Sequence, residues 1–595
     1  MNAKNPWKRL ISLISPPRGR SERLSFSLGK RPIHGEDPPS GEQHPREGTK
    51  IPRKLKDSTT LLKAVFHVPN ASDVVFREIT CAKPPMKVTI AYIEGLAASA
   101  KVESSVLQPL MLLSSVRSYK AKDHVLYLKD ALLANGQVEE KQSVEELVEV
   151  MVGGDTIILF EGRDTALAVE TKGWEHRTVD TAFSERIVKG PQQGFVEVLR
   201  TNTAMIRSML QSPDLVIESF DLGVTSSNKC ALMYMESIAN DKLVEELRRR
   251  LKSIYVSDVL TSGELEQLIE TRKTLIPTIL STERPDRVVR FLLQGSCAVL
   301  VGGDPFALML PVNVLSFVHS PEDEYVRWPY GSVLRLLRYI SLFLVLFLPG
   351  VYVAIVDYHP EMIPTQLLMA IAASREPIPF PINIEVMAMY FGFELIREAG
   401  IRIPSPIGPT IGIVGALLIG DAAVTANLVS PVMVIVIAIT AVASFALPNQ
   451  ELAMFTRVGT LILIVAGSAA GLLGVVSVTY CLVCHLSSLT SLGVPFLVPM
   501  SPFWKVSFSG LTQPAAQDKR WRQLFVRPKD KIRAPENPRL WDIGKTSARK
   551  LRSSVLDQER KNADTGAKGG SRQDDVQTRP GNRKDKSRQR GKGQR

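Results

Sequence analysis

Two places in the sequence carry side chains whose type and spacing could support chemistry. Asp421 lies inside the apolar run 411–429, where an isolated carboxylate costs several kcal/mol unless it meets water, a partner or a proton. Cys481, Cys484 and His485 form the pattern C-x-x-C-H, which is typical of haem attachment. The pattern ends an apolar segment, in a chain that opens without the features of an export signal. We therefore interpret the two cysteines as small apolar side chains and expect no cofactor.

The sequence lacks the patterns of the common enzyme classes. Its eight histidines do not have the spacing of metal ligands, and neither G-x-S-x-G nor a phosphate-binding loop is present. The glycine-containing turns 162–164 and 302–304 are not followed by the Lys-Ser/Thr of such a loop. We therefore predict a protein that is not an enzyme and has no catalytic, cofactor-binding or metal-binding residues.

Long apolar runs dominate residues 333–483. They are 341–356, 411–429, 432–447 and 461–484. A helix needs ~20 apolar residues to cross a hydrocarbon core ~30 Å thick, and each run approaches that length with its flanks. Runs of this kind without polar faces indicate lipid-spanning helices rather than helices buried in a soluble core. The sequence therefore predicts an integral membrane protein.

We place the membrane spans at about 336–356, 408–428, 431–448 and 459–482. Prolines interrupt the segment 361–402 repeatedly, and its helix carries Glu385, Glu394 and Arg397. We interpret this segment as re-entrant or facing protein, where irregular backbone and charge are tolerated. Four crossings are expected, with six as the alternative, and both numbers place the two tails on the same side.

The positive charge of the chain is concentrated in its two tails. Residues 1–60 carry 13 basic and 6 acidic side chains, and residues 518–595 carry 24 and 10, so the part between them is net negative. Both tails are poor in aromatic residues and are predicted to be disordered. The positive-inside rule places both in the cytoplasm. There we expect them to meet anionic membrane lipid rather than nucleic acid.

The span near 408–428 combines a stripe of small residues with the membrane-embedded carboxylate. The small residues, which would let another helix approach closely, are Gly408, Gly412, Ala416 and Gly420. The candidate pore residues are Asp421, about 100° further around the helix, with Val424, Thr425 and Leu428 on its side. A ring of such helices would line a cation path. Alternatively, Asp421 pairs with a neighbouring helix and no pore exists.

The region from about 72 to 320 contains an internal repeat. Segment 87–97 aligns with 229–239 at an offset of 142, and 154–169 aligns with 295–310 at an offset of 141. Each copy predicts an apolar strand, a helical stretch and a hairpin whose glycine-containing turn supplies positive φ. We therefore expect two similar α/β subdomains, with either a ligand cleft or a packed interface between them.

A dense motif, ERIVKGPQQGFVEVLRTNTAMIRSML (185–210), joins the two copies. Its glycines and proline predict a bend, and its apolar spacing predicts an amphipathic helix that begins at Phe195. We expect the motif to couple the subdomains or neighbouring subunits, and the alternative is an ordinary linker helix. The candidate coupling residues are Lys189, Gly190, Pro191, Gly194, Phe195, Glu197, Thr201 and Asn202.

The same stretch resembles the A subunit of spore germinant receptors, the GerA family, whose motif runs E-x-x-V-[RK]-G-P-x-x-G-F-x-E-x-L-x-T-N. A second stretch, SPEDEYVRWPYGSVLRLLRYI (320–340), resembles the family's S-P-E-D-Y-Y and its Arg-rich approach to the first membrane helix. Glu324 departs from the family's Tyr, and Trp328-Pro329 departs from the commoner Arg-Pro. The resemblance covers residues 70–530, nearly everything but the tails.

This resemblance implies a subunit in the inner membrane of the dormant spore that works with a transporter-like B subunit and a lipoprotein C subunit. It also implies a response to a nutrient germinant, bound by this subunit or through its partners. Assembly into a homo-oligomer that acts as a ligand-gated cation channel is implied as well. The alternatives are a secondary transporter subunit, which should show inverted membrane repeats, and a non-conducting membrane scaffold for germination proteins.

The predicted fold is α+β with a membrane part: an N-terminal cytoplasmic pair of similar α/β subdomains precedes a polytopic α-helical membrane domain. The predicted parts are a basic disordered tail (1–60), α/β subdomain 1 (61–184), a linker motif helix (185–210), α/β subdomain 2 (211–332), a transmembrane helical domain (333–500) and a basic, mostly disordered cytoplasmic tail (501–595).

Overall fold

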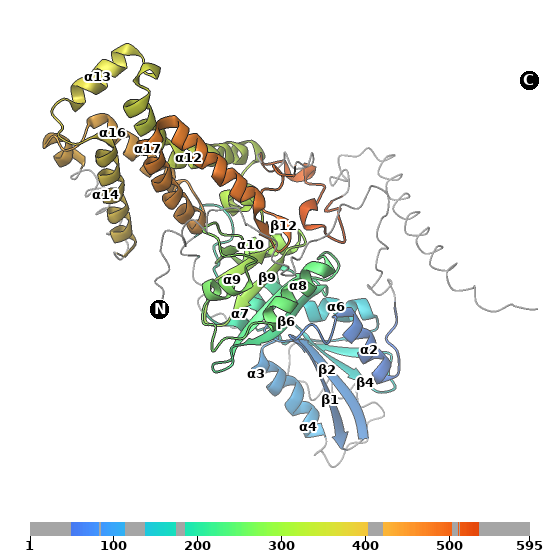
Figure 1. Cartoon of the computed structure of the whole chain (residues 1–595). Coiled ribbons are helices and arrows are strands. Elements are labelled where there is room, and N and C mark those ends of the chain that lie inside the picture. Colours follow the sequence, from blue (N-terminus) through green and yellow to red (C-terminus); the bar gives the residue numbers. More distant parts are fainter. Residues whose placement is uncertain are drawn as a thin grey trace, which may run out of the picture. The chain divides into compact units, whose positions relative to one another are not determined.

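Two five-stranded antiparallel sheets form the first half of the described chain (Figure 1). The computed structural model describes residues 49–82, 85–113, 137–173, 182, 185–402, 420–502, 510 and 512–534. The first sheet has the order β1-β2-β4-β5-β3, built from β1 (Val74–Ala82), β2 (Pro85–Ile93), β3 (Val138–Lys141), β4 (Thr156–Phe160) and β5 (Ala166–Val169). The second has the order β6-β7-β9-β10-β8, built from β6 (Leu215–Leu222), β7 (Asn228–Met235), β8 (Leu280–Thr282), β9 (Cys297–Val301) and β10 (Ala307–Leu310).

The predicted repeat is confirmed down to the register of the strands. Val74 faces Ile93 in the first sheet. Their counterparts 141 and 142 positions later, Leu215 and Met235, face each other in the second sheet. An offset of 141 also relates the pairing of β5 with β3 to that of β10 with β8. The two sheets are therefore copies of one antiparallel unit.

Each sheet is accompanied by helices in equivalent places of the chain. The first copy has α2 (Leu55–Val65), the run α3 (Ser99–Val102), η1 (Glu103–Leu107) and α4 (Gln108–Leu113), and α6 (Val144–Val152); the second has α7 (Leu199–Met209), α8 (Asp241–Lys252), α9 (Ser262–Ile269) and α10 (Pro285–Leu292). Local sequence explains where these helices begin. The Ser143 hydroxyl accepts a hydrogen bond from the Glu146 N–H at the start of α6. Pro285 opens α10, at a position where no helical N–H partner is lost.

The two copies pack against each other through a continuous apolar core. Leu62 of α2 and Leu247 of α8 are fully buried and belong to one cluster that includes side chains of both copies. At the same interface, Arg207 of α7 pairs with Asp73 of the first copy at 2.6 Å. Of the two predicted alternatives, a cleft or a packed interface, the structure has the packed interface.

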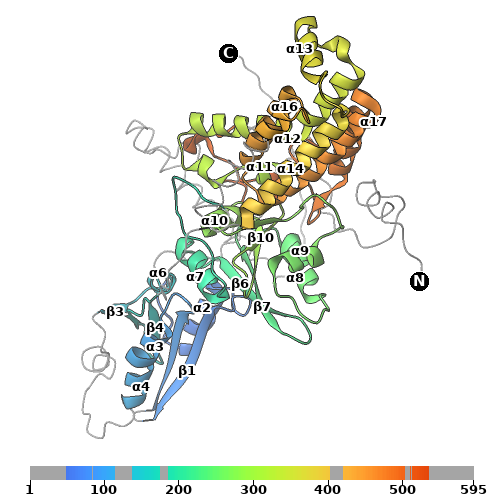
Figure 2. The same cartoon turned by 90° about the vertical axis from the view of Figure 1, so that its left-hand side faces the viewer.

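The second half of the described chain is largely helical, and in both views α12, α14, α16 and α17 gather in one bundle (Figures 1 and 2). Its elements are α11 (Val314–Val318), η3 (Pro321–Glu324), α12 (Trp328–Tyr358), η4 (Pro360–Met362), α13 (Thr365–Arg375), α14 (Ile382–Arg402), α16 (Pro431–Phe445), α17 (Gln450–Ser488), β11 (Thr490–Ser491), β12 (Val494–Pro495), η6 (Ala516–Asp518) and η7 (Leu524–Val526). Among the described residues, α12 and α17 are long and apolar enough to cross a membrane, and α16 is a shorter apolar helix. Residues 420–425 are also helical.

The two ends of α17 contact the same short stretch of the second copy. Ser281 donates a hydrogen bond to the Glu451 carboxylate at 2.5 Å, and the Thr274 hydroxyl lies 3.3 Å from Nε2 of His485. In a straight helix, positions 451 and 485 would be ~51 Å apart. Two backbone positions seven residues apart, such as 274 and 281, are separated by at most ~25 Å. The helix must therefore turn back on itself.

The reversal lies at Ala470 and Gly471, whose backbone is not helical, with Gly471 at φ +58°. α17 is thus a helical hairpin with the legs 450–469 and 472–488. The prediction of one crossing at 459–482 is wrong, because the turn falls inside that apolar run. The run Gly-Ser-Ala-Ala-Gly (467–471) permits the turn, since its small side chains leave room for close packing against α12.

α14 returns along the bundle in the direction opposite to α12. Val386, near its start, is in a buried cluster with Val353 and Ile464, whereas Tyr390, one turn later, donates to the carbonyl of Arg457, nearer the start of α17. The carboxylate of Glu385, 1% exposed, accepts a hydrogen bond from the Ser430 N–H at 2.9 Å. The charged side chain is therefore turned toward protein, as predicted for the segment 361–402.

Candidate functional site

A buried asparagine holds the first part of the motif 185–210. The Asn202 side chain accepts a hydrogen bond from the Val196 N–H at 2.8 Å and donates one to the Val196 carbonyl at 2.5 Å. These bonds keep the backbone of Val196 beside the first turn of α7 instead of inside it. The prediction that the helix begins at Phe195 is therefore wrong: α7 begins at Leu199, and Val198, which would lie inside the predicted helix, is 51% exposed.

Two arginines at the start of α10 bind the non-helical part of the motif. Arg284, with a side chain 1% exposed, donates to the carbonyl oxygens of Glu185 at 3.2 Å and Pro191 at 2.6 Å. Arg287 pairs with the Glu185 carboxylate at 2.9 Å. Segment 185–191 is thereby fixed to the second copy of the repeat.

The bend of the motif lies against an aromatic ring close to the start of α12. Gly190 has φ +131°, and a Cβ added to it would lie 2.6 Å from a ring carbon of Tyr325. The Tyr325 hydroxyl donates to the carboxylate of Asp286 in α10. Burial and this hydrogen bond raise the pKa of Tyr325 to about 12, so the hydroxyl keeps its proton near neutral pH.

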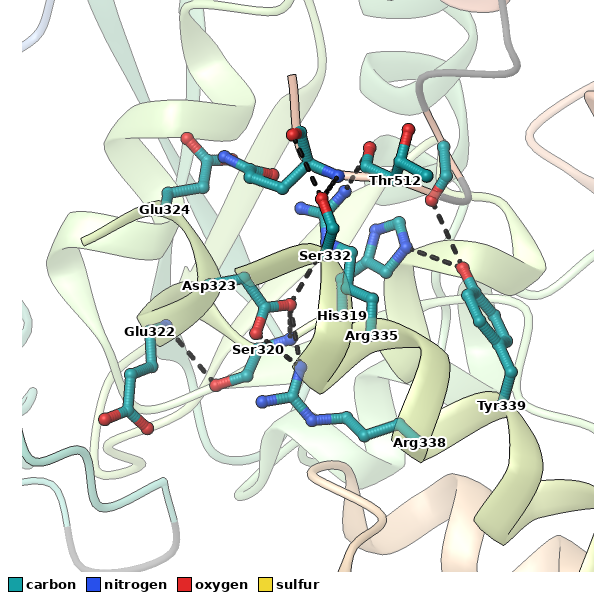
Figure 3. A network of polar contacts seen from close by, with 12 residues as sticks. His319, Ser320, Glu322, Asp323, Glu324, Ser332, Arg335, Arg338, Tyr339 and Thr512 are labelled. Carbon is teal, nitrogen blue, oxygen red and sulfur yellow. Dashed lines mark hydrogen bonds and ion pairs between the residues drawn. The ribbon is translucent and has the colours of Figure 1, made fainter. Parts of the chain in front are cut away.

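A buried ion cluster then joins the turn η3 to α12, as Figure 3 shows. Asp323 is fully buried, with its carboxylate 3.2 Å from Arg335 and 2.6 Å from Arg338. The same carboxylate accepts from the Ser320 N–H, while the Ser320 hydroxyl accepts from the Glu322 N–H. This reciprocal cap fixes the turn. The first turns of α12 are therefore tied to the end of the second copy.

His319 and Tyr339 form a second contact between this turn and α12 (Figure 3). Nε2 of His319 lies 2.8 Å from the Tyr339 hydroxyl oxygen. Burial, together with the positive charge of Arg335, holds the pKa of His319 well below its usual range. The ring is therefore neutral and adds no charge beside the arginines.

Two sets of polar contacts, joined by the short chain segment 323–325, thus connect the motif to the first membrane-type helix. Sequence reasoning identified the motif and the stretch 320–340 separately, but it missed the residues that connect them, which are Arg284, Asp286 and Arg287, and it gave no role to Asp323 within that stretch. The available signal was the run E-R-P-D-R (283–287), because four charges at the opening of a helix require partners. Among the predicted coupling residues, Gly194 and Phe195 are buried, whereas Lys189 and Glu197 are exposed.

The candidate pore residues near α16 fall into two groups. Asp421, Thr425 and Leu428 are exposed, whereas Val424 is half-buried against the apolar cluster that contains Met433. Helical structure ends after residue 425, so Leu428 lies beyond the helix rather than in it as predicted. Of the predicted packing stripe, Gly408, Gly412 and Ala416 lie outside the described residues.

Gly420, the last residue of that stripe, lies against α16. A Cβ added to Gly420 would be 3.6 Å from a methyl group of Val434, so this position is in packing contact with its neighbour. The structure therefore brings Asp421 and Thr425 to an exposed surface and turns Gly420 and Val424 toward protein.

The C-x-x-C-H pattern ends the second leg of α17. Cys481 is exposed, Cys484 is half-buried and both are free thiols. Nε2 of His485 faces the Thr274 hydroxyl, as described above. Within the described residues, no group of three or more His, Cys, Asp or Glu side chains is placed to hold a metal ion.

The contact between α9 and α17 predicts a pH dependence. Burial, then the carboxylates of Glu451 and Glu270, raise the pKa of Glu266 to about 8. Between the ordinary pKa of about 4.5 and this value, only the folded state holds the proton, so the stability falls as pH rises through this window. Glu266→Gln should flatten the dependence and raise the melting temperature at pH 8 by ~3 °C or more. Thermal unfolding of the purified protein from pH 5 to pH 8 measures this.

Glu245→Gln is the control, because Glu245 is exposed on the neighbouring helix α8. It should leave the pH profile as it is. A Glu266→Gln profile that is parallel to the unmodified protein's would contradict the assignment.

Several known proteins of spore germination, and one membrane protein, are similar to this chain. The family model described as Bacillus/Clostridium GerA spore germination protein matches residues 60–527. The chain is 38% identical to spore germination protein KA of Bacillus subtilis (strain 168) over 478 residues, which are 79% of this chain and 87% of that protein. It is 36% identical to spore germination protein GerLA of Bacillus cereus over 469 residues, covering 77% of this chain and 95% of that protein.

Two further similarities extend this set. An uncharacterized membrane protein, YfkQ of Bacillus subtilis (strain 168), is 36% identical over 436 residues, covering 73% of this chain and 83% of that protein. The crystal structure of the N-terminal domain of the A subunit of the Bacillus megaterium spore germinant receptor GerK3 has a TM-score of 0.35 and 32% identity, covering 44% of this chain and 96% of that chain. Because the family match includes most of the chain and the germination proteins are matched over most of their own length, this chain belongs to the GerA family of spore germination proteins and is a homologue of germinant receptor A subunits.

Proposed function

We propose that this chain forms, as a homo-oligomer, a nutrient-gated cation channel that releases ions when the spore germinates. The proposal is carried by Asp421, an exposed carboxylate on a helix whose adjoining residue Gly420 packs on α16. In a lone subunit, an exposed carboxylate at membrane depth is costly, and a shared water-filled path would remove that cost. The spore inner membrane is the proposed location, with a transporter-like B subunit and a lipoprotein C subunit as partners.

We propose six membrane passes rather than four. α12 leads away from the sheets and α14 returns, while the hairpin α17 supplies an outward and a returning leg. Ser430, just before α16, is bonded to Glu385 near the start of α14, so α16 begins at the level where α14 begins, and the predicted span 408–428 is counted as the third pass. α16 then returns toward α17. Six passes keep both basic tails on one side, which the positive-inside rule assigns to the cytoplasm.

The contacts of the motif 185–210 support a role in coupling. A change in the second copy would reach α12 through Arg284, Tyr325 and Asp323, because each is held by hydrogen bonds to the next element. We also propose that subdomain 1 ends at residue 184, the linker motif at 210 and subdomain 2 at 332. We propose in addition that the motif contacts a neighbouring subunit of the oligomer.

Asp421→Asn should lower cation flux through the purified protein in liposomes by about tenfold or change its selectivity, since it removes the charge at nearly constant volume. Glu376→Gln is the matched control, because Glu376 is an exposed carboxylate at the end of α13. A transporter would show saturable, substrate-coupled flux, and a scaffold would show none. Equal flux in Asp421→Asn and unmodified protein would sink the assignment of this helix to the pore.

Val424→Ala tests a different property of the same helix. Because Val424 is half-buried against the cluster around Met433, the change removes packing as well as an apolar wall. We expect leak without nutrient, measured as ion release from spores in buffer, together with a small fall in the melting temperature. Normal retention of ions would show that residue 424 does not close a path.

A further inference from the structure

A basic cavity lies beside the start of α12. Its volume is about 300 Å³, and it is lined by residues around Asn313–Glu324 on one side and by the segment 513–533 on the other. Its charged lining residues are Glu324, Arg335, Asp518, Lys519, Arg520, Arg522 and Arg533. Five of these side chains are basic and two are acidic, so the cavity carries an excess of positive charge.

The acidic side chains at the cavity do not balance this excess. The Glu324 carboxylate already serves two cations, Arg290 at 2.7 Å and Lys519 at 2.8 Å. Behind it, the single charge of Asp323 is shared by Arg335 and Arg338. Arg522 pairs with Asp530 at 3.0 Å. With Asp518, four carboxylates thus lie among seven cations, which include Arg520 and Arg533 of the lining, and unbalanced charge in a buried site costs free energy.

The pKa of Glu324 agrees with this excess of cations. Desolvation lowers the pKa of Lys519, and the nearby Arg533 and Arg290 add to the effect of burial although Glu324 opposes them. Glu324 itself has a lowered pKa, because Arg290, Lys519 and Arg335 outweigh the cost of burying its charge. The lowered pKa of Glu324 reflects the cations around it, whereas that of Lys519 mainly reflects burial.

We propose that this cavity binds an anionic phosphate group. Arginine and lysine side chains match phosphate oxygens in geometry and charge, and a phosphate carries enough negative charge to offset more than one cation. The volume suits a small headgroup or ester rather than a large ligand. Two sources share this chemistry: the headgroup of an anionic phospholipid, which rests on α12 being a membrane span, and a soluble phosphate, which does not.

The test uses the full chain in phosphatidylcholine nanodiscs. One arm titrates inorganic phosphate at low salt and follows binding by calorimetry. The other counts phosphatidylglycerol molecules retained from mixed-lipid nanodiscs by native mass spectrometry. In whichever measurement shows binding, the double variant Lys519→Gln/Arg520→Gln should weaken the affinity ~25-fold and Arg533→Gln should weaken it ~5-fold. Each basic side chain near a phosphate contributes about a fivefold factor to the affinity.

Lys531→Gln is the matched control, because Lys531 is exposed in the same segment but does not line the cavity. It should bind as the unmodified protein does. Arg533 is exposed, so its replacement keeps the proposal testable even when the double variant unfolds. If the cavity variants lose binding of inorganic phosphate, the ligand is a soluble phosphate. If they lose retained phosphatidylglycerol, the ligand is a lipid headgroup. Binding in neither arm, or equal loss in Lys531→Gln, overturns the proposal, and neither result depends on ion flux.

Discussion

Asp323→Asn should lower the melting temperature of the purified protein by about 10 °C. Asp323 is fully buried, and its removal leaves Arg335 and Arg338, 5% and 9% exposed, without their shared charge. Removing one partner of a buried ion cluster costs ~3–5 kcal/mol. Each kcal/mol corresponds to ~2–4 °C in a domain of this size. Thermal unfolding in detergent, and the receptor level in spores, measure the loss.

Asp518→Asn is the control for this change, because it removes an exposed carboxylate from the nearby C-terminal segment. It should leave the melting temperature within about 1 °C. Asp323→Asn/Arg338→Met should recover part of the loss, since one of the two orphaned charges is gone. If the Asp323→Asn and Asp518→Asn variants have the same melting temperature, the ion cluster does not anchor α12.

Gly190→Val should detach the motif from Tyr325 and abolish germination while the sheets remain folded. Its φ of +131° is unfavourable for any residue with a Cβ, and the new atom would approach the Tyr325 ring to 2.6 Å and Ile187 to 2.9 Å. The segment should then be cut by trypsin after Arg186 or Lys189 about tenfold faster than in the unmodified protein. The cutting rate and the germination of spores with normal receptor levels are the measurements.

Gly263→Ala is the matched glycine control. Gly263 lies in α9, and a Cβ there would meet nothing within 4 Å. The change should leave cutting and germination as they are, because alanine is preferred over glycine inside a helix. Normal germination of Gly190→Val spores would reduce the motif to the linker that the sequence left as an alternative.

The sequence was most informative where local pattern and packing agree. The repeat offset of 141–142 anticipated the pairing of Val74 with Ile93 and of Leu215 with Met235, because equivalent apolar positions must face the same core. The start of α7 was missed, since nothing in the local pattern shows that Asn202 binds the backbone of Val196. Propensity alone favours continuing the helix back to residue 195.

Other features depend on contacts between distant residues. The bonds of Arg284 to residues 185 and 191 span more than 90 positions, so no local pattern predicts them. The hairpin of α17 was missed for a different reason. Hydropathy averaged over 461–484 treats the small residues at 467–471 as part of one span, whereas their size is what permits the reversal. A break in a long apolar run is therefore better sought in residue volume than in hydropathy.

The polar contacts of α14 also set an order for biosynthesis. Two of its ion pairs are made with residues already translated, Glu385 with Arg375 at 3.5 Å and Glu394 with Arg397 at 3.2 Å. Further bonds come from later residues: Glu385 at Ser430, Arg397 at Ser444 at 2.6 Å, and Glu394 at Arg457. When α14 leaves the ribosome, residues 430, 444 and 457 have not been translated, so insertion of α14 alone would leave the hydrogen bonds of its charged groups incomplete in lipid. The ion pairs of α12, by contrast, are made with Asp323, which is translated before it. α12 therefore has the acidic partner of its two arginines before it is made, whereas the polar contacts of α14 are completed only when α16 and the first leg of α17 have been translated.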